Sequence, residues 1–323
     1  MPYTHLIMDE REIIAQMRYA GDSLSEIAEQ VGRDKGTVSR ELNRNAFQNP
    51  DGYFAGQAQH QADERRRSGQ RSKRLDDSRL LNYVKDKLRQ HWSPEQISNR
   101  LKKDYPDDAG MRVSHQTIYN WIAEEKHNGG TWHKCLRQSH RKRRKRYGSG
   151  NSRGQIPDRV SIDERPQIVE ERGRLGDWEG DTVEGKGKSG YLVTHVDRKS
   201  RYLVAAKVEN KKAETVNQGT YRAFRRIPAS LCRTMTFDNG KEFAKFKDIE
   251  EELGFDVYFA DPYSSWQRGT NENTNGLLRE FFPKGTDIRE VSHQRVAKVV
   301  RQLNNRPRKC LGYRTPQETF FGH

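Results

Sequence analysis

The sequence predicts a multidomain protein with an all-α N-terminal part and an α/β domain in its C-terminal half. Apolar residues recur at helical spacing in residues 1–60 and again in residues 76–126. From about Gly173 onward the pattern changes to short β-rich runs separated by Gly, Lys and Ser turns. The length of 323 residues leaves room for two or three domains of ordinary size. We therefore expect helical units first and then one domain built on a mixed sheet.

The first helical unit, residues 1–60, is expected to contain three short helices. The second of them begins at Ser23, where "SLSE" is a capping box whose serine and glutamate side chains satisfy free backbone amides. The third begins near Asp34 and turns Val38 and Leu42 toward the interior. Its other face carries five basic or hydroxyl residues, which are Lys35, Thr37, Ser39, Arg40 and Arg44.

This third helix has the composition of a DNA-reading helix. A short helix, a glycine-containing turn and a helix with basic and hydrogen-bonding residues outward form the helix-turn-helix pattern, whose last helix enters the major groove. Base edges are read through hydrogen bonds and phosphates are bound by positive charge, so the five outward residues suit both contacts. A small helical bundle without a DNA role is the alternative, and the basic outward face favours DNA.

A second unit of similar type is expected in residues 76–126. "SPEQ" combines the N-cap residue Ser93 with a proline at the first helical position and a capping-box glutamine. After a longer turn, Ser114 can cap a further helix with Ile118, Trp121 and Ile122 inside. The candidate DNA contacts on its outward face are Gln116, Thr117 and Asn120. Because this face carries fewer positive charges, a protein-contact or purely structural role fits it equally well.

A basic linker is expected in residues 127–170. It contains an unbroken cationic run from Arg141 to Arg146, and a similar segment, "ADERRRSGQRSKR", lies between the two helical units. Blocks of like charge repel one another and seldom fold alone. Two interpretations stay open for these segments: a solvated tether, and an arm that follows DNA phosphates between the DNA-binding and catalytic parts.

The α/β domain is expected in residues 171–323 and ends in a helical tail. The runs "GDWEGDTVE", "GYLVTHVD" and "RYLVAAKV" fit a meander of three strands. A helix follows, then a buried strand, "CRTMTF", that ends at Asp238, a helix closed by Gly254, the short strand "FDVYFA" and a helix capped by Thr270. Asp238 thus lies at the carboxyl end of a strand, where catalytic groups gather in α/β sheets.

Three acidic residues of this domain form a candidate catalytic and metal-binding triad: Asp181, Asp238 and Glu272. They are separated by 56 and then 33 intervening residues. Carboxylates bind the divalent cations that activate a hydroxyl and stabilise the leaving oxygen in phosphodiester chemistry. Glu272 alone has an ordinary explanation, since an acid in the first turn complements the helix dipole. Arg279 lies two turns further on the same face, where it could meet a DNA phosphate.

The first acid of the triad lies in a crowded segment. Asp177, Glu179, Asp181 and Glu184 are close together in the sequence, and the first three point to the same side of a strand. We choose Asp181 because it lies mid-strand. Periodicity by itself leaves its neighbours open as alternatives.

The composition indicates a polyanionic partner. The net charge is +15, the pI is near 9.7 and 33% of the residues are charged, so nucleic acid is the leading candidate and an ordinary solvated basic surface is the alternative. No apolar run reaches the length of a signal peptide or a membrane span. We expect a cytoplasmic protein with no membrane partner.

Together these motifs resemble the bacterial DDE transposases of the insertion sequence 30 family, within the retroviral-integrase-like group. The resemblance spans nearly the whole chain and is carried by "WEGDTV" around Asp181, "TFDNGKEF" around Asp238, "DPYSSWQRGTNENTNGLLR" with Glu272 and Arg279, and the tail "NNRPRKCLGYRTP". It implies an RNase-H-like catalytic core that holds two divalent metal ions, Mg²⁺ by expectation with Mn²⁺ as a substitute, on Asp181, Asp238 and Glu272.

The resemblance also implies the partners and the reaction. Helix-turn-helix units would bind the terminal inverted repeats of a mobile element in double-stranded DNA, and a homo-oligomer would join two such ends to target DNA at the bacterial nucleoid. The expected function is transposition: cutting of a strand at the element's end, followed by strand transfer from the freed 3′-hydroxyl.

Two alternative functions are weighed against transposition. One is a helix-turn-helix transcriptional regulator with a non-catalytic C-terminal domain, for which the acidic triad would have no use. The other is a structure-specific nuclease of RNase-H type, which would need neither strand transfer nor sequence-specific end binding.

Overall fold

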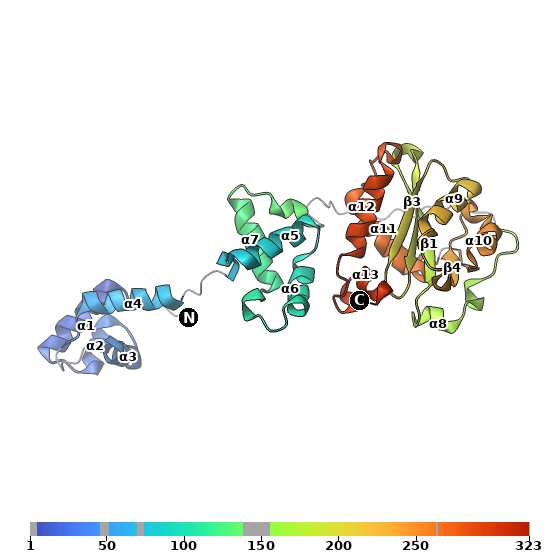
Figure 1. Ribbon diagram of the computed structural model, residues 1–323. Helices are drawn as coiled ribbons and strands as arrows, with labels where there is room; N and C mark the ends of the chain where they lie inside the picture. The colour runs from blue at the N-terminus through green and yellow to red at the C-terminus, as the bar shows by residue number, and fades with distance from the viewer. Residues whose placement is uncertain (1–4, 46–51, 70–73, 138–155, 263, 323) are drawn as a thin grey trace. The chain divides into compact units, whose positions relative to one another are not determined.

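The computed structural model describes residues 5–45, 52–69, 74–137, 156–262 and 264–322 (Figure 1). The chain divides into two compact units, Met1–Asp76 and Asp77–His323. The cationic run from Arg141 to Arg146, expected in the linker, lies outside the described residues. No helix within the described ranges is long and apolar enough to cross a membrane.

The first unit contains the three predicted helices and one more. Its helices are α1 (Met8–Ala20), α2 (Leu24–Val31), α3 (Lys35–Asn45) and α4 (Ala55–Gly69). The capping box at Ser23 is confirmed, because the serine hydroxyl accepts the Glu26 amide and the Glu26 carboxylate accepts the Ser23 amide. Val38 and Leu42 of α3 are buried as expected.

Helix α4 differs from the expected organisation. It contains the limit set at residue 60 and runs into the basic segment between the two helical units, which was expected to be a solvated tether or a phosphate-binding arm. Arg11 of α1, which is 3% exposed, explains why the helix belongs to this unit: its guanidinium donates to Glu41 of α3 at 2.7 Å and to Gln59 of α4 at 2.7 Å. A buried charge needs such partners, so α1, α3 and α4 are held together.

The second unit begins with three helices. They are α5 (Ser78–Arg89), α6 (Pro94–Asp104) and α7 (His115–His127). Ser93 and Ser114 cap α6 and α7 as predicted. Part of the expected linker is ordered, since α8 (Gln167–Glu170) buries Val169. The domain limits expected at residues 126 and 170 fall inside the second unit and stay predictions.

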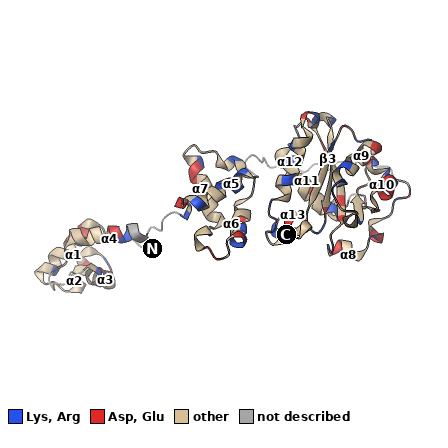
Figure 2. Ribbon diagram, in the orientation of Figure 1, with Lys and Arg blue, Asp and Glu red and all other residues tan. Residues whose placement is uncertain are grey.

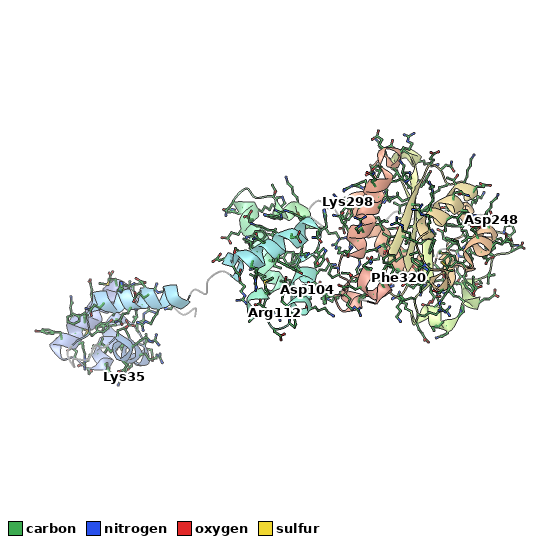
Figure 3. All side chains as sticks on the ribbon, viewed as in Figure 1. Lys35, Asp104, Arg112, Asp248, Lys298 and Phe320 are labelled. Carbon is green, nitrogen blue, oxygen red and sulfur yellow. The ribbon has the colours of Figure 1, made fainter. Side chains whose placement is uncertain are left out.

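Helix α6 contacts the C-terminal tail through polar side chains. The tail consists of α12 (His293–Asn304) and α13 (Pro316–Phe321). Arg100 of α6 donates two hydrogen bonds to the Glu318 carboxylate at 2.8 and 2.5 Å, and Glu95 accepts one from Lys309 at 2.8 Å. Phe320 of α13, which is labelled in Figure 3, packs edge-on against Trp178 of the sheet core.

The described residues of the C-terminal domain form a five-stranded mixed sheet with the order β3-β2-β1-β4-β5. The strands are β1 (Asp177–Glu184), β2 (Tyr191–Asp197), β3 (Leu203–Val208), β4 (Thr234–Phe237) and β5 (Asp256–Phe259). The first three strands form the predicted antiparallel meander, while β4 and β5 run parallel to β1. This is the mixed sheet expected of an RNase-H-like core.

Helices cover both faces of the sheet (Figure 1). Helices α9 (Ala213–Phe224) and α10 (Phe246–Leu253) pack in one apolar cluster with Trp178, and α12 packs with α11 (Gly269–Phe281) in another with Val183. Because side chains alternate along a strand, Asp177, Glu179 and Asp181 lie on the same side of β1 as Val183, which is the α11 side. The sheet therefore turns these acids toward α11.

His195 of β2 makes the stability of this domain depend on pH. Its ring is fully buried against Phe224 and Phe237, and Nε2 lies 3.1 Å from the Thr220 hydroxyl. Burial lowers the pKa of His195 from 6.5 to about 3. The unfolded chain therefore binds a proton that the folded chain does not. The free energy of unfolding should fall by about 1.4 kcal/mol per pH unit as the pH drops below about 6.5.

We predict that His195→Gln reduces this slope by that amount. Urea unfolding followed by circular dichroism between about pH 4 and 7 measures it. The exposed His293 supplies the control, because His293→Gln should keep the wild-type slope. An unchanged slope in His195→Gln would contradict a neutral buried imidazole.

Candidate active site

Asp181 lies near the middle of β1, and two hydrogen-bond donors orient its side chain. The Thr182 amide donates to its Oδ1 and Asn275 Nδ2 of α11 donates to its Oδ2, both at 2.8 Å. Thr194, opposite Asp181 on β2, donates to the Asp181 backbone carbonyl at 3.2 Å. The half-buried carboxylate is therefore oriented by β1 and α11 together.

Asp238 lies beside Asp181 because of the strand register. In the parallel pairing of β1 with β4, Glu179 is opposite Thr236. Carried two positions further, this register brings Asp181 next to Asp238, which directly follows β4 as predicted. Burial raises the pKa of Asp181, the positive charge of Arg268 opposes that shift, and the negative charge of Asp238 adds to it. The two carboxylates thus interact electrostatically.

Two other acids on this side of β1, Asp177 and Glu179, are already neutralised elsewhere. Asp177 binds the Arg174 guanidinium at 3.0 Å and accepts the Thr234 hydroxyl at 3.0 Å. Glu179 binds Arg198 at 2.9 Å, and both side chains are almost completely buried. Of the acids on this side of β1, Asp181 is therefore the one that interacts with Asp238.

Glu272 lies in the first turn of α11, as predicted, and its side chain is exposed. Asn275, three residues further along the helix, reaches Asp181. The structure thus brings Asp181 and Asp238 together and places Glu272 one helical turn from the Asp181 contact. Within the described ranges no three His, Cys, Asp or Glu residues are grouped closely enough to hold a metal ion.

The expectation that Thr270 caps α11 is wrong. The helix begins at Gly269, and Arg268 is the N-cap residue without a side-chain cap. Thr270 is buried inside the first turn, where its hydroxyl accepts Arg201 Nη1 at 2.8 Å. Arg201, a half-buried donor from the β2–β3 turn, thus binds the hydroxyl that would otherwise have accepted a helix amide.

Two basic side chains and a further acid complete the surroundings of the aspartates. Arg268 binds Asp238, and Lys211 binds Glu242 at 3.0 Å. Glu242 also accepts the Thr182 hydroxyl at 3.2 Å. Sequence reasoning did not single out Arg268, Glu242 or Asn275. Arg268 lies four residues before Glu272, and Asn275 lies three residues after it. Because residues at these spacings share a helix face, the sequence carried a usable signal for both.

Arg279 is engaged with the backbone. Its Nη2 donates to the Glu184 carbonyl at 2.8 Å, which joins α11 to the end of β1. The side chain is half-buried, and burial lowers its pKa. A phosphate contact by Arg279 stays a prediction.

The outward residues of α3 border two hollows of the first unit. Lys35 is exposed at the start of the helix (Figure 3), and Ser39 faces a hollow on the Tyr53 side. Thr37, Arg40 and Arg44 line a second hollow of about 210 Å³, together with Arg65 and Arg66 of α4. Figure 2 shows acidic and basic residues on α4. The end of α4 thus adds positive charge beside the candidate DNA-reading face.

The outward residues of α7 bind one another and the helix start. Gln116 donates to Asn120 at 2.8 Å, and both are exposed. Thr117 is half-buried, and its hydroxyl lies 2.8 Å from that of Ser114, the N-cap residue. Of the three candidate contacts on α7, Thr117 is thus the one engaged in capping.

Comparison with known proteins identifies the family. Residues 2–45 match the family described as a helix-turn-helix domain, and residues 171–265 match the integrase core domain. The chain is 42% identical over 316 residues to the transposase for insertion sequence element IS4351 of Bacteroides fragilis, covering 98% of this chain and 95% of that protein. The chain belongs to the insertion sequence 30 family of transposases.

Two further proteins are similar to this chain. The transposase is 39% identical over 324 residues to the transposase InsI for insertion sequence element IS30A of Escherichia coli K12, covering 97% of this chain and 82% of that protein. The catalytic core domain of BIV integrase, a solved structure, aligns with a TM-score of 0.37 and 17% identity over 46% of this chain and 95% of its own.

Membership in this family settles the broad function. The transposase binds DNA through its helix-turn-helix domain and carries out DDE-type nucleotidyl transfer in its integrase core. The alternative of a regulator with a non-catalytic C-terminal domain is therefore wrong. Transposases of this type use divalent metal ions.

The residues around Asp181 and Asp238 fit such an ion. Both are carboxylates, the oxygen ligands that hard divalent cations prefer. They lie on neighbouring strands, and a positively charged group, the Arg268 guanidinium, already binds Asp238 and the backbone next to Asp181. Because the site binds the positively charged guanidinium, it has the negative charge and the oxygen ligands that a metal ion needs.

We predict that Asn275→Ala lowers metal-dependent DNA cleavage. The change removes the side-chain donor that orients Asp181, and loss of such an orienting contact costs about 10- to 100-fold in metal affinity or activity. Cleavage of a labelled DNA end, measured over a Mg²⁺ titration, tests this. Asn273→Ala on the exposed side of the same helix is the matched control and should cleave normally. Equal activity of the two variants would mean that the Asn275 contact has no role in catalysis.

Proposed function

We propose that Asp181, Asp238 and Glu272 are the catalytic residues of this transposase and hold two divalent metal ions, Mg²⁺ by preference with Mn²⁺ able to substitute. The observation that supports the proposal is that Asp181 and Asp238 lie close enough to interact electrostatically, with α11 bound to Asp181 through Asn275. Glu272 is one turn from that contact, so rotation of its side chain brings a third carboxylate toward the pair.

The proposed reaction consists of two in-line displacements at phosphorus. When bound, the metal ions activate the attacking hydroxyl and stabilise the leaving oxygen. The carboxylates of this chain position those ions, and the β1–β4 pairing fixes the separation of Asp181 and Asp238. Water attacks first and releases a 3′-hydroxyl at the element's end. That 3′-hydroxyl then attacks a phosphodiester of the target DNA, and no covalent protein intermediate forms.

The DNA partners follow from the helical units. We infer that α3 reads the terminal inverted repeats of the element through Lys35, Thr37, Ser39, Arg40 and Arg44. A weaker contribution is assigned to Gln116, Thr117 and Asn120 of α7, and a phosphate contact to Arg279. Because two ends must be joined to one target, the transposase acts as a homo-oligomer on double-stranded DNA at the bacterial nucleoid, in the cytoplasm.

Glu272→Gln should abolish cleavage and strand transfer in Mg²⁺ while end binding is retained. Glutamine keeps the size of the side chain but lacks the negative charge that a hard cation requires. Gel-shift binding and strand-transfer assays on the same DNA end separate the two properties. The exposed Glu290 provides the control, and Glu290→Gln should keep both. Normal cleavage by Glu272→Gln would remove Glu272 from the triad.

Arg40→Ala should weaken binding to the cognate end by about 1–3 kcal/mol more than binding to random DNA. A side chain that contacts base edges specifies the sequence, whereas one that contacts only phosphate affects all sequences alike. Fluorescence anisotropy with the two DNAs at several salt concentrations measures the difference. An equal loss on both DNAs would assign Arg40 to phosphate alone.

A further inference from the structure

Arg268 bridges the surroundings of both candidate aspartates. Its Nη2 donates to Asp238 Oδ2 at 3.1 Å, and its Nη1 donates to the Gly180 carbonyl at 3.0 Å. Gly180 immediately precedes Asp181 in β1. The guanidinium therefore lies between the backbone beside one aspartate and the carboxylate of the other. Its side chain is only 13% exposed, so water screens this ion pair weakly.

The backbone around Arg268 is anchored on both sides. Gln267 binds Asp261 twice: its Oε1 accepts the Asp261 amide at 2.8 Å, and its Nε2 donates to the Asp261 carboxylate at 2.9 Å. Asn271 is tied to Glu179 of β1 by its amide and by its side chain, both at 2.9 Å. Any displacement of the guanidinium is thus a rotation of one long side chain and leaves the start of α11 in place.

The charges around the aspartates are matched in pairs. Lys211, whose positive charge also reaches Asp181, is bound to Glu242 at 3.0 Å. Arg268 is bound to Asp238 and balances the repulsion between the two neighbouring aspartates. A divalent cation on Asp238 would stand within a few ångströms of the guanidinium, and two positive charges at that distance repel strongly where water is partly excluded.

We propose that Arg268 is a built-in counter-cation that competes with the catalytic metal for Asp238. Metal binding and the Arg268–Asp238 ion pair exclude one another, and the guanidinium rotates away when the metal binds. The ion pair orients Asp238 and neutralises the aspartate pair, and as a consequence it weakens metal binding. This inference rests on the proposed metal site at Asp181 and Asp238.

The test is Mn²⁺ binding to the full-length transposase without DNA, followed by the loss of the free-Mn²⁺ electron paramagnetic resonance signal. Arg268→Gln removes the charge and keeps a polar side chain, although a shorter one. We expect it to tighten Mn²⁺ binding by about tenfold, the change that 1.4 kcal/mol produces. Arg268→Lys keeps the charge and should bind Mn²⁺ as the wild type does.

Two further variants serve as references. Arg222→Gln removes an exposed arginine of α9 that binds a backbone carbonyl, and it should leave Mn²⁺ affinity unchanged. Asp238→Asn should lose Mn²⁺ binding.

Thermal unfolding checks that each variant is folded. Arg268→Gln should melt at a lower temperature than the wild type in EDTA. Mn²⁺ should raise the Tm of Arg268→Gln by more than it raises the Tm of the wild type, because tighter binding to the folded state stabilises it more. Arg268→Met serves as a second charge-removing variant if Arg268→Gln fails to fold.

The outcomes separate this inference from the proposed function. If Asp238→Asn loses Mn²⁺ while Arg268→Gln binds it no more tightly than the wild type, the competition is overturned and the metal site stands. If Asp238→Asn binds Mn²⁺ like the wild type, the metal site itself is overturned, and the competition with it. Tighter binding in Arg268→Gln together with loss in Asp238→Asn supports both.

Discussion

The geometry of the candidate active site depends on Glu179, a fully buried carboxylate in the middle of the sheet. It accepts Arg198 Nη1 at 2.9 Å and the Asn271 amide at 2.9 Å. Arg198, equally buried, also donates to the Val169 carbonyl at 3.1 Å. Leaving one member of a buried pair without its partner costs about 3–5 kcal/mol, so the contact is strongly maintained once formed. Through it, β1, the β2–β3 turn, α8 and the start of α11 are held together.

The contact between Glu179 and Asn271 fixes which residues of α11 lie opposite which residues of β1. With Asn271 fixed on Glu179, the next turn of the helix brings Asn275 to Asp181, and Glu272 lies between them in the sequence. The β1–β4 register then supplies Asp238 from the neighbouring strand. A structural ion pair two residues from Asp181 thus positions a site whose own acids are more exposed.

The candidate site and the helix-turn-helix domain have opposite electrostatic requirements. DNA phosphates are attracted by the positive charge of the chain as a whole, which is +15. A cluster of carboxylates would repel the same phosphates, so it must be neutralised by metal ions or by local cations. Arg268 and Lys211 supply such local charge beside Asp238 and Glu242. In the first unit, Arg65 and Arg66 of α4 extend the positive surface next to α3.

Much of the fold was predictable from the sequence because it depends on local signals. Capping boxes at Ser23 and Ser93 act within four residues, and the alternation of β1 and the end of β4 at Asp238 appear in short windows. Helix α4 and the start of α11 were not predicted correctly. In each, a tertiary partner overrides the local pattern: Arg11 holds α4, and Arg201 takes the hydroxyl of Thr270.

The sequence by itself determined that acids lie on one side of β1, that another follows β4 and that a third begins a helix. Only the tertiary structure decided which acid of β1 faces Asp238, because Asp177 and Glu179 are neutralised by partners that periodicity does not reveal. It also decided that Asn275 and Arg268 reach the aspartates, through contacts that span 94 and 30 residues of sequence. Local propensity acts over a few residues, whereas the pairing of charges depends on which strands and helices meet.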